Sequence, residues 1–358
     1  MRGPRVVRDH GCMDTVRVIR DRGGLVEAVH HVQVGLWRFD AASGGVPGSG
    51  EAIGGEQLAY LRSAAKPVQA LACLLTGAAD RFSFTVPELA LACASHNGEP
   101  FHIAAARSML RKAGVDESAL LCGAHAPIHA ASAAQLVREG GEPEAIHNNC
   151  SGKHAAMLAA CVAAGWPTAD YLAPEHPLQQ LNRDNVAAFS GVPVEDLVIG
   201  IDGCSAPVFG MPISGAARLI AGIATPESAG VSDELTAAAT RAADAMTSAP
   251  EMVGGTERSD TDLMRATGGR VLSKIGAEGL WSIGVRGAGI GLAVKSEDGS
   301  SVAATRAGLE VLRVMGVLAD DAWEALARHH DPVRRNLRKL DVGRVRIEIP
   351  QALQELLR

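Results

Sequence analysis

Hydrophobic and polar residues alternate near the beginning of the chain, over residues 16–40, and again over residues 270–305. Such alternation predicts strands that bury one face. Residues 40–56 are rich in Gly, Ser and Ala and contain a proline, so they are predicted to form a loop. The predicted strands are 16–19, 25–39 with a break near His30 and His31, 197–201, 271–275, 281–285, 290–294, 302–305 and 344–349.

The middle of the chain has a different period, because its apolar residues recur every three or four positions. This spacing predicts helices that pack one face against a core. The first helix, over residues 61–76, would hold Ser63 in its first turn and end at Gly77, and Pro67 lies close enough to its start to be tolerated. The other predicted helices are 87–94, 101–113, 131–139, 151–164, 177–188, 215–223, 231–246, 306–318 and 321–329.

The order of these elements is strands, then a long helical block, then strands again. This order favours an α+β fold in which N- and C-terminal segments share one mixed sheet and the helices form an insertion. We expect a sheet lobe made of residues 16–60 and 206–358, and a mainly helical lobe made of residues 61–205, with the functional site between them. Residues 1–15 are expected to be a disordered extension.

Composition narrows the function classes. The chain has 358 residues and a formal net charge of −6, and only 3% of its residues are aromatic. These values argue against a nucleic-acid-binding surface and against a polybasic membrane patch. No run in the sequence is long and apolar enough to suggest a membrane span. The seven cysteines are scattered without a disulfide framework, which predicts a cytoplasmic protein.

A serine and a lysine stand three residues apart, at Ser63 and Lys66, in the first predicted helix. Positions i and i+3 of a helix share a face, about 5–6 Å apart at Cβ, so the amine can take the proton of the hydroxyl. This is the spacing found in Ser-Lys acyl-transfer enzymes. Only six lysines occur in the chain, and Lys66, Lys153 and Lys274 all have Gly or Ser nearby. Their placement favours a chemical use for amines, because an amine can lose a proton where arginine cannot.

Two further segments could join this pair. Ser95, in the run CASHNGE, would relay a proton or contact the substrate, or alternatively form a turn or helix N-cap. Lys274, in the run SKIG, would lie at a sheet edge beside the serine. There it would disfavour a charge on Lys66 by repulsion and attract a substrate carboxylate. The alternative for Lys274 is an ordinary lysine at the end of a strand.

Two cysteines lie in polar loops that contain glycine, Cys150 in the run HNNCSGKH and Cys204 in the run DGCSAP. Two thiolates with one nitrogen ligand and an open fourth position suit zinc. His154 is the usual type of nitrogen ligand, whereas Lys153 can bind only as a neutral amine. The alternative is that both cysteines are small residues beside unrelated turns.

Residues 252–262 are predicted to begin as a flexible loop that carries Arg258. This arginine could bind a carboxylate. The alternative is that the segment only begins a helix, with Asp260 as its N-cap.

Together these motifs resemble the rhizobial-type L-asparaginases, a family related in fold to serine β-lactamases and Ser-Lys glutaminases. The resemblance extends from about Gly24 to the C-terminal strand and leaves residues 41–55 unmatched. The runs that carry it are RSAAKP from residue 62, CASHNGE from residue 93, HNNCSGKH from residue 147, IDGCSAP from residue 201, GGTER from residue 254 and SKIG from residue 273.

The resemblance implies a serine β-lactamase/glutaminase-like fold, a zinc cofactor and an asparaginase activity. For the nitrogen ligand of zinc it selects Lys153 over His154. The implied catalytic residues are Ser63, Lys66, Ser95 and Lys274, and the implied zinc ligands are Cys150, Lys153 and Cys204, with Asp202 as a carboxylate behind them.

The reaction that we expect is hydrolysis of L-asparagine to L-aspartate and ammonia through an acyl-enzyme on Ser63, with Lys66 and Lys274 as the general base system. The backbone N–H of Ser63 would be one oxyanion donor, and a second donor would come from near Gly276. Zinc would shape the substrate pocket rather than activate water.

The substrate-binding residues are expected to be Arg62, Asp202 and Arg258, and the sequence does not choose which arginine holds the α-carboxylate. We also expect a homodimer that binds neither nucleic acid nor membranes. Two alternatives remain open. One is a glutaminase or β-lactamase-like amidase on the same fold, and the other is a non-catalytic zinc-binding amino-acid sensor.

Overall fold

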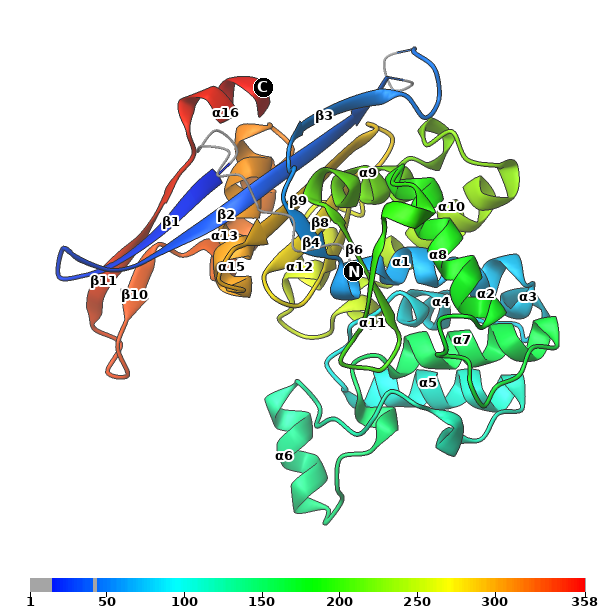
Figure 1. The fold of residues 1–358 in the computed structure, drawn as a ribbon. Helices are drawn as coiled ribbons and strands as arrows, with labels where there is room; N and C mark the ends of the chain where they lie inside the picture. The colour runs from blue at the N-terminus through cyan, green and yellow to red at the C-terminus, as the bar shows by residue number, and fades with distance from the viewer. Residues whose placement is uncertain (1–14, 41–43, 358) are drawn as a thin grey trace, which may run out of the picture.

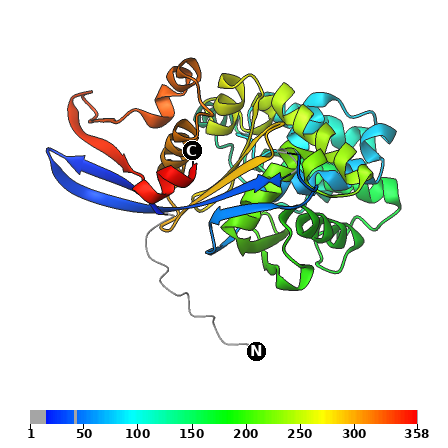
Figure 2. The same ribbon diagram turned by 90° about the horizontal axis from the view of Figure 1, so that it is seen from above.

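A long curved sheet carries most of the helices at one end and extends at the other end as two hairpins (Figures 1 and 2). The computed structural model describes residues 15–40 and 44–357. The predicted extension therefore lies outside the described residues, except for Thr15, which begins the first strand. The α+β class predicted from the sequence is confirmed.

The large sheet has the order β10-β11-β1-β2-β9-β8-β7, and β3 pairs with β2 off this path. N- and C-terminal strands thus share one sheet, as predicted. Every pairing among the described strands is antiparallel, so the expected mixed sheet is wrong. Short hairpin turns join β1 to β2 and join β7, β8 and β9 in succession, and such turns require antiparallel neighbours. The strands are β1 (Thr15–Arg22), β2 (Leu25–Phe39), β3 (Gly50–Gly54), β7 (Val271–Ile275), β8 (Leu280–Val285), β9 (Ile290–Ser296), β10 (Val333–Arg335) and β11 (Asp341–Glu348).

A second sheet of three short strands has the order β4-β6-β5. Its strands are β4 (Leu58–Tyr60), β5 (Val198–Ile201) and β6 (Pro207–Pro212). The N–H of Leu61 donates to the carbonyl of Phe209 at 2.8 Å, which continues the pairing of β4 with β6. The segment that leads into Ser63 is therefore fixed to this small sheet.

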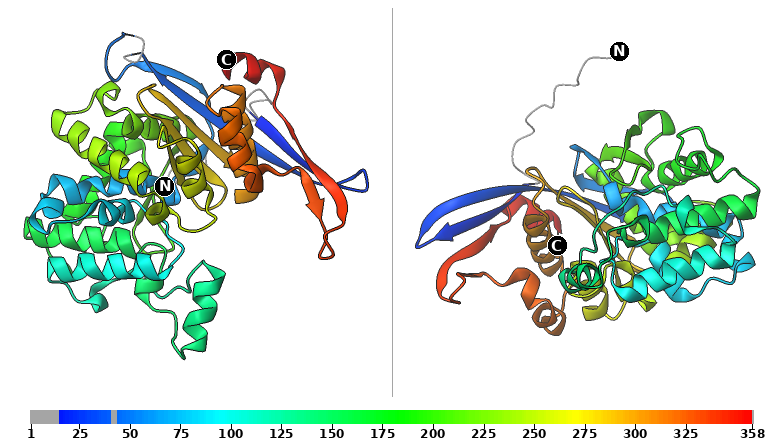
Figure 3. Two further views of the ribbon diagram at one scale, coloured as in Figure 1. Left: turned by 180° about the vertical axis from the view of Figure 1, so that it is seen from behind. Right: turned by 90° about the horizontal axis from the view of Figure 1, so that it is seen from below.

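Most helices gather beside the small sheet and the β7 side of the large one (Figure 3). They include α7, which is apolar on nearly every side and is correspondingly buried. The helices are α1 (Lys66–Gln69), α2 (Leu71–Leu75), α3 (Ala78–Arg81), α4 (Val86–Ala92), α5 (Pro100–Ala113), α6 (Ala130–Arg138), α7 (Ser151–Ala164), α8 (Pro177–Ser190), α9 (Ile213–Ala224), α10 (Asp233–Ser248), α11 (Pro250–Val253), α12 (Ser259–Ala266), α13 (Ser301–Val314), α14 (Asp320–Ala325), α15 (Ala327–His330) and α16 (Gln351–Leu357). Short 3-10 helices are η2 (Arg62–Ala65), η3 (Glu117–Ala119), η4 (Ala145–His147), η5 (Val194–Asp196) and η6 (Pro226–Ser228).

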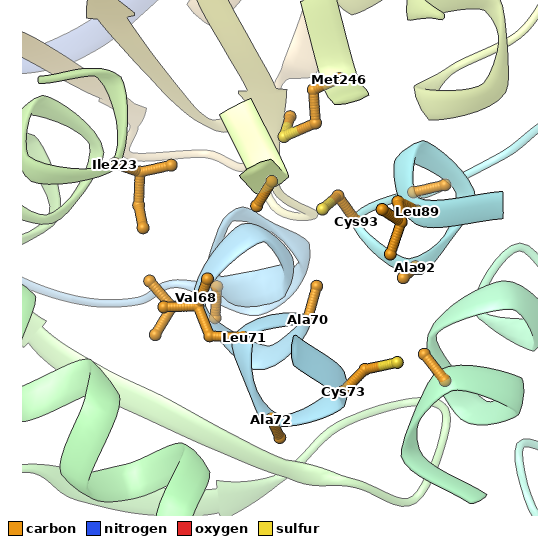
Figure 4. Close-up of a cluster of buried hydrophobic side chains, with 14 of the residues drawn as sticks. Val68, Ala70, Leu71, Ala72, Cys73, Leu89, Ala92, Cys93, Ile223 and Met246 are labelled. Atoms are coloured by element: carbon orange, nitrogen blue, oxygen red, sulfur yellow. The ribbon is translucent and has the colours of Figure 1, made fainter. Parts of the chain in front are cut away.

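Two hydrophobic cores cover the two faces of the large sheet. One lies under α13, where Trp281 is fully buried. The other lies under α9 and continues through the helices. Val68, Leu71, Cys93 and Met246, which are drawn in Figure 4, belong to this second core. Consequently the short helices that follow Ser63 are anchored in this core.

Several sequence-based expectations fail locally. Residues 302–305 are the start of α13 rather than a strand, because Ser300 caps a helix there by accepting a hydrogen bond from the N–H of Ala303. A short apolar run does not separate the two possibilities by its period alone. β2 continues unbroken through His30 and His31, the loop at 40–56 contains β3, and the single helix expected at 61–76 is three short pieces. Strands β4, β6 and β10 and helices α3, α11 and α16 were not predicted.

The domain boundaries stay predictions, although α10 packs on α2 and α4 within the helical part. The six cysteines in the described part are free and buried. Among the described helices, none combines the length and the hydropathy that crossing a membrane requires.

Candidate active site

Ser63 lies in η2, directly after a residue with an unusual backbone conformation. Arg62 has a φ of +48°, in the left-handed region that costs a non-glycine residue about 1 kcal/mol. Its side chain is held by an ion pair from Nε to Oδ1 of Asp202, at 2.6 Å. The N–H of Ser63 has no hydrogen-bond partner among the described residues, and its side chain is half-buried. A strained entry and a free N–H together leave Ser63 available to a bound molecule.

Lys66 begins α1 and is completely buried. Its Nζ donates a hydrogen bond to Oγ of Ser95 at 2.7 Å, so the structure brings these two predicted residues into contact. Ser95 is itself fixed in place, because its N–H donates to the carbonyl of Val253 at 3.0 Å. The N–H of Asn97 makes the same kind of bond to Gly254, at 2.9 Å. Ser95 therefore belongs to an extended segment clamped against the 253–254 loop, and the proposed N-cap for α5 is wrong since Glu99 fills that position.

Lys274 lies on β7, which ends the strand order of the large sheet, and its side chain is completely buried. β7 packs against η2, the turn that carries Ser63. The approach is closest at Gly276, where an added Cβ would lie 2.7 Å from the carbonyl oxygen of Leu61. Glycine is needed there because any side chain would push the strand away from η2. The edge strand of the large sheet thus packs against the turn that carries Ser63.

The charge of Lys274 is balanced between opposing neighbours. The pKa of Lys274 is lowered to about 7, chiefly by burial and also by Lys66 and Arg258, while Asp260 and Cys150 oppose the shift. The amine donates to the carbonyl of Ile275 at 2.9 Å. Near neutral pH this amine can therefore exist in either charge state.

The N–H groups just after Lys274 are already used. The N–H of Ile275 donates to Oδ2 of Asp260 at 3.0 Å, and that of Gly276 donates to the carbonyl of Leu280 at 2.8 Å. The expectation of a second oxyanion donor near Gly276 therefore fails at these two positions. The free N–H of Ser63 is the donor that the geometry supports.

Asp260 was treated in the sequence as a helix cap, and the structure corrects this. Arg258 occupies the N-cap position of α12, while Asp260 is fully buried against β7. Its Oδ1 accepts from Oγ of Ser273 at 2.7 Å and from Nε1 of Trp281 at 3.1 Å. Its Oδ2 lies 3.8 Å from Nζ of Lys274. Local sequence gave no signal for this role, since an Asp in a first helical turn is commonplace.

The two arginines differ in how their charges are used. Arg62 forms an ion pair with Asp202, whose pKa is lowered by hydrogen bonds from Gly203 and Arg62 despite burial, which raises it. Arg258 donates from Nη1 to the side-chain oxygen of Asn97 at 3.0 Å and forms no ion pair with the described residues. The positive charge of Arg258 is therefore still available to a carboxylate.

Cys150, Lys153 and Cys204 come together behind this cluster, each at most 5% exposed. Nζ of Lys153 lies 3.0 Å from Sγ of Cys204. A hydrogen bond from Cys204, assisted by Lys66 and Lys153, lowers the pKa of Cys150 well below its ordinary value. This arrangement favours a thiolate beside two amines.

The zinc ligands expected from the sequence are Cys150, Lys153 and Cys204, and the structure places Lys153 against Cys204. No three His, Cys, Asp or Glu side chains in the described part of the chain are placed to hold a metal, and Cys150, Cys204 and His154 would be such a trio. Lys153 as the third ligand is what the family resemblance implies, and it stays a prediction. His154 is fully buried, and its Nδ1 lies 2.7 Å from the hydroxyl of Tyr171.

A carboxylate and an imidazole that the sequence did not single out organise the Ser95 segment. Glu99 accepts from the hydroxyl and the N–H of Thr256, at 2.6 and 2.9 Å. His96 lies against Oγ of Ser151, at 3.0 Å from its Nε2, and stacks on the ring of His102 with centroids 4.9 Å apart. These contacts join the Ser95 segment to the loop before α12 and to the start of α7.

A comparison with known protein families finds a match over most of the chain. The model of the L-asparaginase II family matches residues 18–347. The chain belongs to this family. The resemblance to rhizobial-type L-asparaginases is thereby confirmed, and family membership implies a hydrolase that acts on amides.

Other comparisons add little. None of the curated proteins matches the chain. Among solved structures the chain is similar to one titled "Crystal Structure Analysis of Mglu in its native form", with 14% identity over 78% of this chain and 63% of that one and a TM-score of 0.34. The chain thus spans less than two thirds of that protein, and so remote a likeness supports no argument about the fold.

Proposed function

We propose that the chain hydrolyses L-asparagine to L-aspartate and ammonia, with Ser63 as nucleophile. The observation that supports the proposal is that two buried amines come from elements that adjoin the turn of the half-buried Ser63. Lys66 stands three residues after Ser63 and bonds to Ser95 at 2.7 Å, and Lys274 comes from a strand that packs against the turn of Ser63.

The chemistry proceeds in two steps. Oγ of Ser63 attacks the side-chain amide carbon while its proton passes to Lys66, and the N–H of Ser63 stabilises the oxyanion. The C–N bond then breaks, and Ser95 passes a proton from Lys66 to the leaving ammonia. Water next attacks the ester carbon and loses a proton to the same amine, and Ser63 leaves as the hydroxyl. Lys274 disfavours a charge on Lys66 throughout.

The proposed orientation of the substrate follows from a difference between Arg62 and Arg258. Arg62 forms an ion pair with Asp202, whereas Arg258 only donates a hydrogen bond to Asn97. Arg258 keeps a charge that no carboxylate among the described residues neutralises, so we assign it the substrate α-carboxylate. Asp202 is paired with Arg62 and still exposes part of its carboxylate, so it suits the substrate ammonium group. Arg62 then acts mainly by holding Asp202.

Zinc would be held by Cys150, Lys153 and Cys204. When bound it would supply a fixed positive centre that shapes the substrate pocket. The chain's own residues would do the proton transfers, with Asp202 close enough to influence Lys153. A serine β-lactamase/glutaminase-like fold, a homodimer and a cytoplasmic location remain part of the proposal.

Replacing Ser63 by Ala tests the nucleophile. Ammonia release from asparagine should disappear while circular dichroism stays unchanged, and Ser118→Ala, at an exposed turn, is the matched control. Activity should be greater on asparagine than on glutamine in the parent enzyme. Substantial ammonia release by pure Ser63→Ala would reject the proposal.

Metal removal tests the role of zinc separately. Chelation should raise KM for asparagine more than it lowers kcat, because the ion acts on the pocket. A complete loss of kcat with unchanged KM would instead show that the ion takes part in the chemistry.

A further inference from the structure

The buried carboxylate of Asp260 is not explained by the proposed roles. It is completely enclosed, and so is Lys274, whose Nζ lies 3.8 Å from its Oδ2. Burying a carboxylate is costly unless hydrogen bonds and an opposite charge compensate it. Here both kinds of compensation are present, so the carboxylate and the amine form a matched pair inside the protein.

The surroundings of Asp260 fix its position tightly. Oδ1 accepts from the hydroxyl of Ser273 and from the indole of Trp281, at 2.7 and 3.1 Å. Oδ2 accepts from the N–H of Ile275 at 3.0 Å. Three donors from β7 and β8 thus aim the carboxylate, and the oxygen that faces Lys274 cannot turn away without breaking the bond to Ile275.

The charged and titratable groups around Lys274 come from four other elements or their ends. Most of these groups are positive or are uncharged when buried. Asp260 is therefore the main group that stabilises a charged amine on Lys274. The groups are Asp260 on α12, Arg258 before α12, Lys66 on α1, Cys150 before α7 and Cys93 after α4.

We propose that Asp260 is a positioning residue that holds the amine of Lys274 at the end of β7 and keeps it charged beside Lys66. Without this carboxylate the buried amine would lose the strongest of its negative neighbours and would release its proton more easily. A neutral Lys274 would then no longer place a positive charge at the end of β7, beside η2. The importance of this charge for catalysis rests on the proposed function, whereas the ion pair itself does not.

Because the chain has only six lysines, the charge state of Lys274 beside Asp260 can be measured directly. With six lysines in the chain, the ε-carbon NMR signals can be titrated one by one, and that of Lys274 is assigned by its absence in Lys274→Met. In Asp260→Asn the midpoint of the Lys274 signal should fall by about one to three pH units. Each unit reduces the charged fraction of Lys274 at neutral pH by up to about tenfold. The pH–rate limb that follows this signal should move to lower pH, and kcat at neutral pH should fall more than KM rises.

The Asn variant has a way to keep its fold. Its amide nitrogen can replace Oδ1 and donate to the hydroxyl of Ser273, which also accepts from Trp281 at 2.9 Å, while its oxygen still accepts from Ile275. Asp260→Ser is a second variant without the charge, should the first prove unstable.

Trp281→Phe is the matched control, because it removes a donor to Asp260 and leaves the charge. This variant should lower the melting temperature without moving the Lys274 midpoint. An unchanged Lys274 midpoint in folded Asp260→Asn or Asp260→Ser would overturn the inference, as would an equal shift in Trp281→Phe. Activity that survives Ser63→Ala would reject the proposed function and leave the NMR result standing.

Discussion

His102 should make the protein sensitive to acid for a reason that is visible in its hydrogen bonds. The side chain is completely buried, and its Nδ1 accepts from the N–H of Glu99 at 3.2 Å. Its Nε2 lies 2.9 Å from the carbonyl of Glu251, to which it must donate. A second proton could bind only at Nδ1, where it would confront the N–H of Glu99. The fold therefore requires the neutral ring.

The size of the effect follows from the difference in the pKa of His102 between the folded and the unfolded chain. Burial lowers the pKa of His102 from 6.5 to about 4. Between these values the unfolded chain binds the proton and the folded one does not, so the free energy of unfolding falls as the pH falls. The contribution is complete above pH 6.5 and lost by about pH 4, with a total of about 3 kcal/mol and a slope of up to about 1.4 kcal/mol per pH unit.

Urea unfolding followed by circular dichroism at several pH values in this window measures the slope. His102→Gln keeps a donor for Glu251 and cannot bind a proton, so its free energy of unfolding should depend less steeply on pH. The difference in slope between the two proteins isolates His102 from His96, which is also buried and also resists protonation. Identical slopes for the two proteins would refute the argument.

Two further predictions concern packing and helix capping. Gly291→Ala would place a Cβ 2.0 Å from the carbonyl oxygen of Ala217 on α9, so it should lower the free energy of unfolding by about 3 kcal/mol or more in urea titrations. Gly203→Ala meets nothing closer than 3.8 Å and should stay within about 1 kcal/mol, and equal losses would contradict the packing argument. Thr85→Ala removes the side-chain cap of α4, where Thr85 and Glu88 bond to each other's N–H, and should cost about 1 kcal/mol. An unchanged urea midpoint would show that this cap is dispensable.

The spacing of residue types along the sequence was enough to predict much of the fold and part of the candidate site. The alternation of apolar residues located β2, β7, β8 and β9, because a strand that buries one face imposes a period of two on its own sequence. The Ser63–Lys66 pair could also be recognised from the sequence, because residues three positions apart in a helix lie on the same face.

Local spacing failed where a partner lies elsewhere in the chain. The ion pair of Arg62 with Asp202 spans 140 residues, and that of Asp260 with Lys274 joins a helix to a strand. Residues 302–305 show the same limit, since their apolar pattern suits both a strand and the helix that Ser300 caps.

The sequence by itself thus determined the periods of the elements, the family and the residue types able to do acyl transfer. The tertiary structure decided which amine has a carboxylate beside it, which arginine keeps its charge and which backbone N–H is free. The physical reason is that periodicity reflects burial along one element, whereas charge state and hydrogen-bond availability depend on groups that only folding brings within a few ångströms.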